Sequence, residues 1–235
     1  PRVDLSISIH EHWEHYPYID NPEEFASFLE NHQPQFKAHT KGGRLALATL
    51  AGLPVPKKVI VNPQTDLMAV LNLLNTTKLF AVRSSASNED KIDKSNAGIH
   101  TSYLRVGAPD IIAKTQDLFE KGIDEVVIQE FVEPVISGVA FVRNISAEID
   151  LVEGHLEEFI SGKKEPYCFT ISKMGKNWEM PIALEVQNVL KQKYFKSKKL
   201  WSFLQNTIKA FHYQPSDIEW AWDGYQFHLL QIRPV

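Results

Sequence analysis

The stretch DIEWAWDGYQFHLLQIRP, residues 217–234, decides the fold because it reads as two strands joined by a turn. Its halves, 217–222 and 227–232, are rich in aromatic and branched side chains, and the Asp223-Gly224 pair between them is a strong hairpin signal. Side chains alternate between the two faces of a strand, so residues two apart share a face. The segment therefore predicts a hairpin with two carboxylates, an amide and a guanidinium on one face. These groups belong to Asp217, Glu219, Gln231 and Arg233.

Spacing alone leaves two interpretations of that face open. In the first, it binds Mg²⁺ and phosphate, because hard cations take oxygen ligands and arginine grips phosphate oxygens in a bidentate manner. In the second, it is a solvated outer face with a cross-strand ion pair.

Composition limits the classes of protein to consider. A chain of 235 residues with 43% hydrophobic side chains can bury one substantial core or two small lobes. A net charge of −4 creates no long-range field for polyanions, so neither nucleic acid nor an anionic membrane is an expected partner. The single cysteine, Cys168, excludes an internal disulfide, and no apolar run approaches the roughly 20 residues that cross a bilayer. We therefore expect a cytoplasmic protein.

Outward from the hairpin, hydrophobic periodicity predicts an α+β chain of two lobes. Predicted helices span 45–50, 67–74, 111–119 and about 184–211. Predicted strands span 58–61, 79–82, 103–106, 126–128, 139–144, 159–162 and 167–171. Residues 129–132, ahead of Pro134, are predicted to form a hinge. We expect an N-terminal lobe of residues 1–128, with an extra N-terminal segment and a long polar loop, and a C-terminal lobe of residues 129–235.

Three features of the first half are candidates for binding phosphate, and each has a plainer interpretation. Lys41-Gly42-Gly43 precedes a predicted helix, where exposed N–H groups favour anions, although this tripeptide is common in loops. Arg83 ends a buried strand, where it meets either a ligand or an ion-pair partner. The polar loop that ends at Ala97-Gly98 has the small residues needed to close over phosphates, but an ordinary surface loop has the same composition.

Six segments, taken in order, resemble the ATP-grasp nucleotide-binding domain shared by phosphoenolpyruvate synthase, pyruvate phosphate dikinase and rifampin phosphotransferase. The segments are KGG through AGLPVP at 41–56, AVRSSA at 81–86, ED with SNAG and YL between 89 and 104, VIQEFV at 127–132, SGVAF at 137–141, and the DIEWA and LLQIRP motifs of the hairpin. The resemblance runs from Lys41 to Pro234. It implies a two-lobed ATP-grasp fold with a nucleotide cleft between the lobes.

The resemblance also implies roles for individual residues around ATP and Mg²⁺. Lys41 and Arg83 would contact phosphates, Gly98 and Ser102 would lie in the loop that covers them, and Arg233 would reach the terminal phosphate. Beside the adenine would stand Gln129, with the backbone of Glu130 and Val132. Asp217, Glu219 and Gln231 would hold the metal or phosphate. Lys41, Arg83 and Arg233 are the expected catalytic residues.

Departures from the family pattern occur at several positions. His39-Thr40 replaces the glycines that usually precede the lysine, Ile99 replaces a glutamine, and Ser102 replaces a threonine while keeping its hydroxyl. The expected activity is transfer of a phosphoryl group from ATP to an acceptor, a histidine on a separate domain or protein. Two alternatives remain: a non-catalytic nucleotide-binding module that regulates a partner, and an ATP-grasp carboxylate-amine ligase.

Overall fold

The computed structural model describes residues 40–85, 102–174, 177–179 and 197–235, which form two units. Among the described residues, the first unit contains 40–52 and 56–131, and the second contains 53–55 and 132–235. Gly98 and residues 184–196 of the predicted fourth helix lie outside the described residues.

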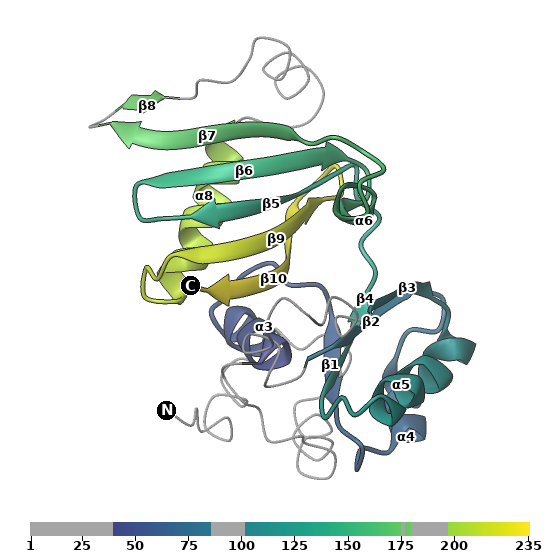
Figure 1. Ribbon diagram of the computed structural model, residues 1–235. Coiled ribbons are helices and arrows are strands. Elements are labelled where there is room, and N and C mark those ends of the chain that lie inside the picture. The colour runs from purple at the N-terminus through teal and green to yellow at the C-terminus, as the bar shows by residue number, and fades with distance from the viewer. Residues whose placement is uncertain (1–39, 86–101, 175–176, 180–196) are drawn as a thin grey trace. The chain divides into compact units, whose positions relative to one another are not determined.

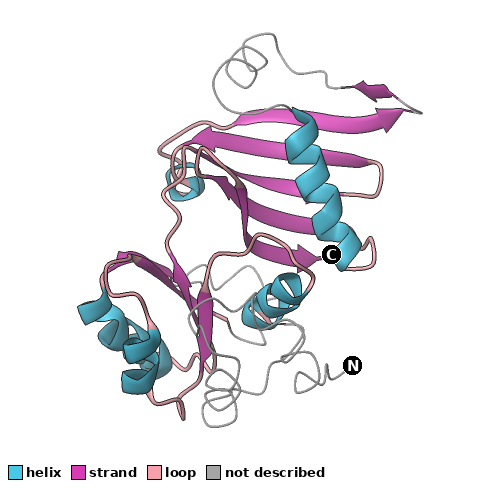
Figure 2. Cartoon of the chain, turned by 180° about the vertical axis from the view of Figure 1, so that it is seen from behind, coloured by secondary structure: helices cyan, strands magenta, loops and turns pink. Residues whose placement is uncertain are grey.

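The first unit is built on a four-stranded antiparallel sheet with strand order β1-β4-β2-β3 (Figure 1). Its strands are β1 (Lys58–Val61), β2 (Phe80–Ser84), β3 (Ser102–Val106) and β4 (Val126–Glu130). The helices are α3 (Lys41–Leu50), α4 (Leu67–Leu73) and α5 (Ile111–Glu120), with the 3₁₀ turn η2 (Ala108–Asp110) before α5. Helices α4 and α5 cover one face of the sheet, and α3 packs on the other (Figure 2).

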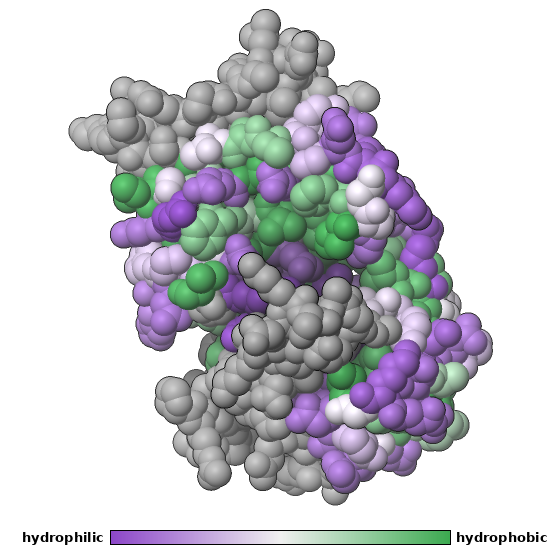
Figure 3. Space-filling model, in the orientation of Figure 1, coloured by the Kyte–Doolittle hydropathy of each residue, from purple (hydrophilic) through white to green (hydrophobic). Residues whose placement is uncertain are grey.

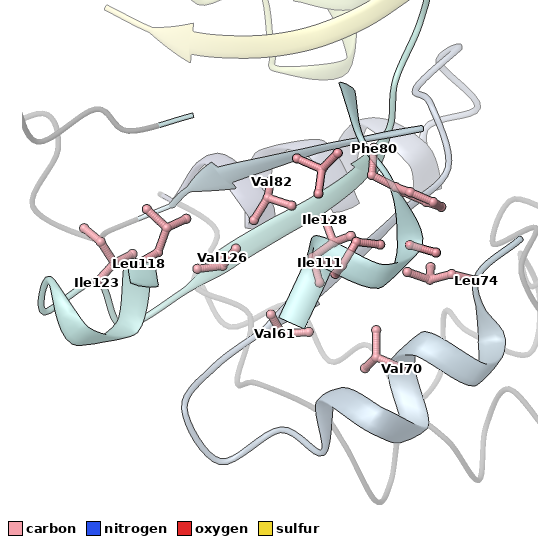
Figure 4. Packing of buried hydrophobic residues seen from close by; sticks show 12 residues of the cluster. Val61, Val70, Leu74, Phe80, Val82, Ile111, Leu118, Ile123, Val126 and Ile128 are labelled. Atoms are coloured by element: carbon pink, nitrogen blue, oxygen red, sulfur yellow. The ribbon is translucent and has the colours of Figure 1, made fainter. Parts of the chain in front are cut away.

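Alternation along these strands explains the two layers. Figure 4 shows apolar side chains of the sheet, among them Val82 and Ile128, packed against Val70 of α4 and Ile111 of α5. The neighbouring strand residues point toward α3 instead, as Ile60 does, since a Cβ on Gly42 of α3 would lie 3.2 Å from it. The core therefore forms on one face of the sheet and leaves the other to α3 and to polar side chains.

The second unit contains a six-stranded antiparallel sheet with strand order β10-β9-β5-β6-β7-β8. The strands are β5 (Ile136–Val142), β6 (Ser146–Glu153), β7 (Tyr167–Met174), β8 (Asn177–Glu179), β9 (Ser216–Trp222) and β10 (Phe227–Pro234). Helix α8 (Ser197–Ala210) covers one face (Figure 2), and α6 (Leu156–Ile160) is a short helix after β6. Phe203 of α8 stacks on Phe227, which also contacts Trp220 and Trp222, so these aromatic rings lie on the α8 side of the sheet.

The structure confirms the hairpin and corrects three predictions. Residues 159–162 are not a strand: α6 ends at Ile160, and Gly162 follows with φ +71°, which is typical of a glycine that terminates a helix. Strand β6 was missed, although Ala147, Ile149 and Leu151 alternate with polar residues along it. The predicted hinge is also wrong in part, because β4 continues to Glu130 and remains paired with β1 and β2.

Within the part of the chain that the structure describes, no helix combines the length and the apolar character needed to cross a membrane.

Candidate functional site

In the first unit, the start of α3 brings Lys41 to the end of strand β2. Thr40 caps the helix by accepting a hydrogen bond from the Gly43 N–H at 3.0 Å, which explains why the helix begins four residues before the predicted one. The Lys41 ammonium donates to the carbonyl oxygen of Ser84 at 3.0 Å, next to Arg83 in sequence. Both cationic side chains are buried, at 9% and 7% exposed. The structure therefore places Lys41 at the end of the strand that carries Arg83.

A buried relay of hydrogen bonds fixes this arrangement. The Gly42 N–H donates to the Ser85 hydroxyl at 2.7 Å, and that hydroxyl donates to a carboxylate oxygen of Glu125 at 2.5 Å. A Cβ on Gly42 would lie 2.7 Å from the same oxygen, so a larger residue there would have to displace the Glu125 carboxylate. Ser85 and Glu125 were not predicted as partners, because the two residues lie 40 positions apart and no spacing pattern connects them.

Strand pairing places further predicted residues on the α3 side of the same sheet. Arg83 is the Cα partner of Ser102 on β3 and of Val127 on β4. Two residues along β4, Gln129 is the partner of Lys58 on β1. Cα partners on an antiparallel ladder point to the same side, so Ser102, Arg83, Gln129 and Lys58 share one face.

Lys58 was not among the predicted site residues, and it is the most perturbed group of this face. Its side chain is 8% exposed and donates to the Thr49 hydroxyl at 2.5 Å. Burial disfavours the charged amine and lowers the pKa of Lys58 from 10.5 to about 7. Lys58 is the first residue of the run KVIV, so the sequence places it at the end of a strand and does not indicate burial. Only the tertiary structure shows that its side chain is buried.

Two further residues, Glu130 and Val132, were predicted to stand beside the adenine through their backbone. Glu130 is half-buried, and its N–H donates to the Lys57 carbonyl at 2.7 Å, so that N–H is already engaged. Val132 is half-buried and belongs to the second unit, just after the chain leaves the first.

In the second unit, the four residues predicted from the hairpin lie on two neighbouring rungs. Glu219 is the Cα partner of Gln231, and Asp217 is the partner of Arg233. A bulge at Leu230 shifts the register after Leu229, yet all four side chains remain on the face opposite α8. We call these four residues the polar hairpin face. Hydrophilic and hydrophobic side chains are mixed on this side of the sheet (Figure 3).

Within the polar hairpin face, Gln231 holds Arg233. With its amide oxygen turned toward the guanidinium, Gln231 accepts hydrogen bonds from Nε and Nη2 of Arg233, each at 2.7 Å. Gln231 is 5% exposed, whereas Arg233 is half-buried. A buried amide thus fixes the orientation of a guanidinium that remains partly accessible.

The carboxylates of Asp217 and Glu219 suit Mg²⁺, which is commonly held by one or two carboxylates together with substrate phosphates and water. Within the described ranges, no group of three or more histidine, cysteine, aspartate or glutamate side chains is arranged to hold a metal by itself. The residues present therefore fit an ion that shares its ligands with a phosphate better than a closed structural metal site.

The turn of the hairpin is well defined. Asp223 accepts from the N–H groups of Tyr225 and Gln226 at 2.7 and 2.8 Å, and its other oxygen lies 2.7 Å from Nε2 of His228. Burial tends to raise the pKa of Asp223, but these hydrogen bonds outweigh it and the pKa is lowered. The turn therefore anchors the end of the hairpin remote from Asp217 and Arg233.

Comparison with known proteins identifies relatives of this chain, although no protein-family model matches it. It is 28% identical to the protein named "Probable phosphoenolpyruvate synthase" of Methanocaldococcus jannaschii, over 66% of this chain and 17% of that protein. The corresponding protein of Archaeoglobus fulgidus is also 28% identical, with 66% and 26% covered. The "Rifampicin phosphotransferase" of Streptomyces sviceus is 29% identical, with 66% and 23% covered. The chain thus spans about a quarter or less of the length of each of these relatives.

Solved structures provide a comparison of the fold. The D-alanine-D-alanine ligase of Helicobacter pylori matches with a TM-score of 0.50 and 16% identity, over 84% of this chain and 54% of the ligase. The ATP-grasp ligase PsnB also matches, with a TM-score of 0.46 and 17% identity, over 84% of this chain and 52% of that one. The resemblance that the ordered motifs predict is confirmed: the chain is similar in sequence to proteins named phosphoenolpyruvate synthase and rifampicin phosphotransferase, and it has an α+β ATP-grasp fold.

Proposed function

We propose that the chain is an ATP-binding phosphotransferase module, which binds Mg-ATP and passes a phosphoryl group to a histidine on a separate domain or protein. The observation that carries the proposal is the polar hairpin face, where two carboxylates lie beside a guanidinium oriented by Gln231. Oxygen ligands for a cation next to a donor for phosphate oxygens are the groups that a metal-bound polyphosphate requires. The names of the curated relatives support the same class of reaction.

In the proposed complex, each residue has a role that its surroundings favour. Lys41 and Arg83 neutralise phosphate charge from the first unit, and Arg233 stabilises the charge that develops on the transferred group. Asp217 and Glu219 would hold Mg²⁺, which would supply positive charge to neutralise the phosphate oxygens. Gln231 positions Arg233. Such groups act by alignment and charge stabilisation, so the module needs no covalent intermediate of its own.

The acceptor belongs to this proposal as well. The chain covers only 17 to 26% of these relatives, which leaves room for an acceptor domain elsewhere in a parent chain or in a partner. Incubation with ATP labelled at the β or the γ phosphate, in the presence of candidate acceptor domains, followed by mass spectrometry, identifies which phosphate moves and to which residue. We expect a phosphohistidine. Label that stays in nucleotide or inorganic phosphate with every acceptor would contradict the transfer.

The role of Arg233 has its own test. Arg233→Ala should slow transfer roughly 100- to 1,000-fold, the usual cost of removing one charge-stabilising donor, while ATP affinity changes much less. Arg143→Ala is the matched control, because Arg143 is exposed and paired with Glu148 outside the polar hairpin face. Equal losses of affinity and rate for Arg233→Ala, or no loss of either, would exclude the assigned role.

A further inference from the structure

One histidine shares the side of the second-unit sheet that carries the polar hairpin face. His228 of β10 is the Cα partner of Ala221 on β9, and Ala221 is two residues from Glu219. Side chains two residues apart on a strand lie on the same face, about 6.6–6.8 Å apart, and Cα partners point to the same side. The His228 ring therefore lies on the face opposite α8, one row of side chains away from Glu219.

A carboxylate orients this ring. Nε2 of His228 lies 2.7 Å from an oxygen of Asp223, and the two side chains are 12% and 27% exposed. Burial tends to raise the pKa of Asp223, but its hydrogen bonds with His228 and with two backbone N–H groups lower the pKa, so the carboxylate is ionised near neutral pH. An ionised carboxylate only accepts hydrogen bonds, so Nε2 carries the proton between them. Asp223 thus fixes both the orientation of the ring and the nitrogen that carries its proton.

The second ring nitrogen, Nδ1, has the chemistry of a nucleophile. When Nε2 carries the only proton of a neutral imidazole, Nδ1 keeps an unshared electron pair. Among the described residues, the structure shows no hydrogen bond to Nδ1 of His228. Activated nucleophiles and bases commonly have a partner such as Asp223, which fixes the side chain and the position of its proton.

The structure of the turn alone does not explain the histidine. The N–H groups of Tyr225 and Gln226, which define the turn, both donate to Oδ1 of Asp223, whereas His228 contacts Oδ2. A substitution of His228 therefore leaves these two hydrogen bonds in place. The chemistry of the ring can be tested separately from the stability of the turn.

We propose that His228 is a phosphorylation site, at which the chain accepts the terminal phosphoryl group of ATP bound at the polar hairpin face. This inference rests on the proposed function and adds a modification of the chain itself to the transfer to a separate acceptor. The electron pair of Nδ1 forms the new N–P bond while the bond from the terminal phosphorus to its bridging oxygen breaks, and ADP leaves with that electron pair. The proton stays on Nε2, where the Asp223 carboxylate balances the positive charge of the phosphorylated ring.

The test is incubation of the 235-residue chain alone with Mg-ATP, followed by intact-mass measurement and peptide mapping without acid, so that phosphohistidine survives. The variant His228→Gln keeps an N–H donor for Asp223 but has no nucleophilic nitrogen. The variant Asp223→Asn keeps an oxygen for the turn and removes the charge that holds the Nε2 proton. His212→Asn is the control, because His212 is exposed after α8 and has φ +57°, a conformation that asparagine tolerates.

We expect wild type and His212→Asn to gain one phosphoryl group, which maps to His228, and His228→Gln to gain none. Asp223→Asn should be phosphorylated roughly tenfold or more slowly, because its ring loses the partner that keeps Nδ1 free of a proton. Calorimetry with Mg-ATP accompanies each measurement and should show binding to every variant, so that lost phosphorylation is not mistaken for lost affinity.

Two results would overturn the inference while the proposed function survives. In the first, wild type binds Mg-ATP and phosphorylates a separate acceptor but gains no phosphoryl group itself. In the second, His228→Gln is phosphorylated as fast as wild type, which places the modification at another residue. If wild type does not bind ATP at all, the proposed function fails, and the inference fails with it because His228 has no phosphoryl donor.

Discussion

At the scale of single residues, Lys58 makes the stability of the protein depend on pH. The pKa of Lys58 is lowered to about 7 in the folded state, whereas the unfolded chain has the ordinary value of 10.5. Between these values the unfolded state binds a proton that the folded state does not, so the free energy of unfolding rises with pH. Below about pH 7, Lys58 is charged in both states, and the folded state bears the whole free-energy cost of burying that charge. Above about pH 10.5, Lys58 is neutral in both states, and this cost disappears.

Lys58→Met removes this cost and should stabilise the protein near neutral pH. The upper estimate for the gain is about 5 kcal/mol, from the size of the pKa difference. Urea denaturation of both proteins at a series of pH values from 7 to 10 measures it. We expect the difference between variant and wild type to shrink as pH rises. A difference that is constant over this range would show that Lys58 is not buried as described.

Lys58 and Glu125 also show where prediction from sequence ends at this scale. Arg83, Lys41 and Gln231 could be predicted as site residues because their motifs are local and ordered along the chain. Burial of Lys58 arises from pairing with Gln129, 71 positions away, and from the contact with Thr49. Local periodicity contains no information about such pairings, so the burial of Lys58 beside Gln129 could not be predicted from the sequence.

At the scale of elements, two motifs of the sequence prove to be one packing contact between neighbouring strands. Gly138 of β5 is the Cα partner of Trp220 on β9. A Cβ on Gly138 would lie 2.8 Å from the indole ring and 2.5 Å from the Asp150 carbonyl oxygen on β6. Gly138 of the SGVAF motif therefore leaves the space that the Trp220 ring of the DIEWA motif occupies. This contact favours the register between β5 and β9, the strand that carries Asp217 and Glu219.

Gly138→Ala should accordingly destabilise the second unit, by about 1–3 kcal/mol if the sheet can shift to relieve the clash. Thermal unfolding monitored by tryptophan fluorescence measures the loss. Gly107→Ala is the control, since Gly107 has φ −74° and a Cβ there would meet only Pro109 Cδ, at 3.7 Å. Equal melting temperatures for Gly138→Ala and wild type would show that Trp220 does not pack over this position.

Helices and strands were predicted correctly where the hydrophobic residues follow one clear spacing along the sequence. Strand β1 and the hairpin of β9 and β10 combine alternating or apolar runs with clear turn residues, and their predicted bounds differ from the structure by two residues at most. The error at α6 has a physical cause: Phe159-Ile160 reads as a short apolar strand, but Glu157 and Glu158 in the first turn favour a helix start. A segment of five residues is too short for helical and strand periodicity to be told apart.

At the scale of the whole molecule, each of the two units carries its own set of residues for the proposed function. The first unit contains Lys41 and Arg83, and the second contains the polar hairpin face. The ATP-grasp fold is shared with a ligase that is only 16% identical, so the fold does not determine the reaction. The proposed activity therefore depends on the residues of the two faces.

The central claim is that the chain binds ATP through Mg²⁺ held by the polar hairpin face, and calorimetric titration of the chain with ATP, with and without Mg²⁺, tests it most directly. We predict saturable heat that requires Mg²⁺ and is lost in Asp217→Asn/Glu219→Gln, because both metal ligands are then neutral. The isosteric substitutions should leave the fold intact. Absence of Mg²⁺-dependent heat in the folded wild-type chain, or unchanged heat in the double variant, would contradict the claim.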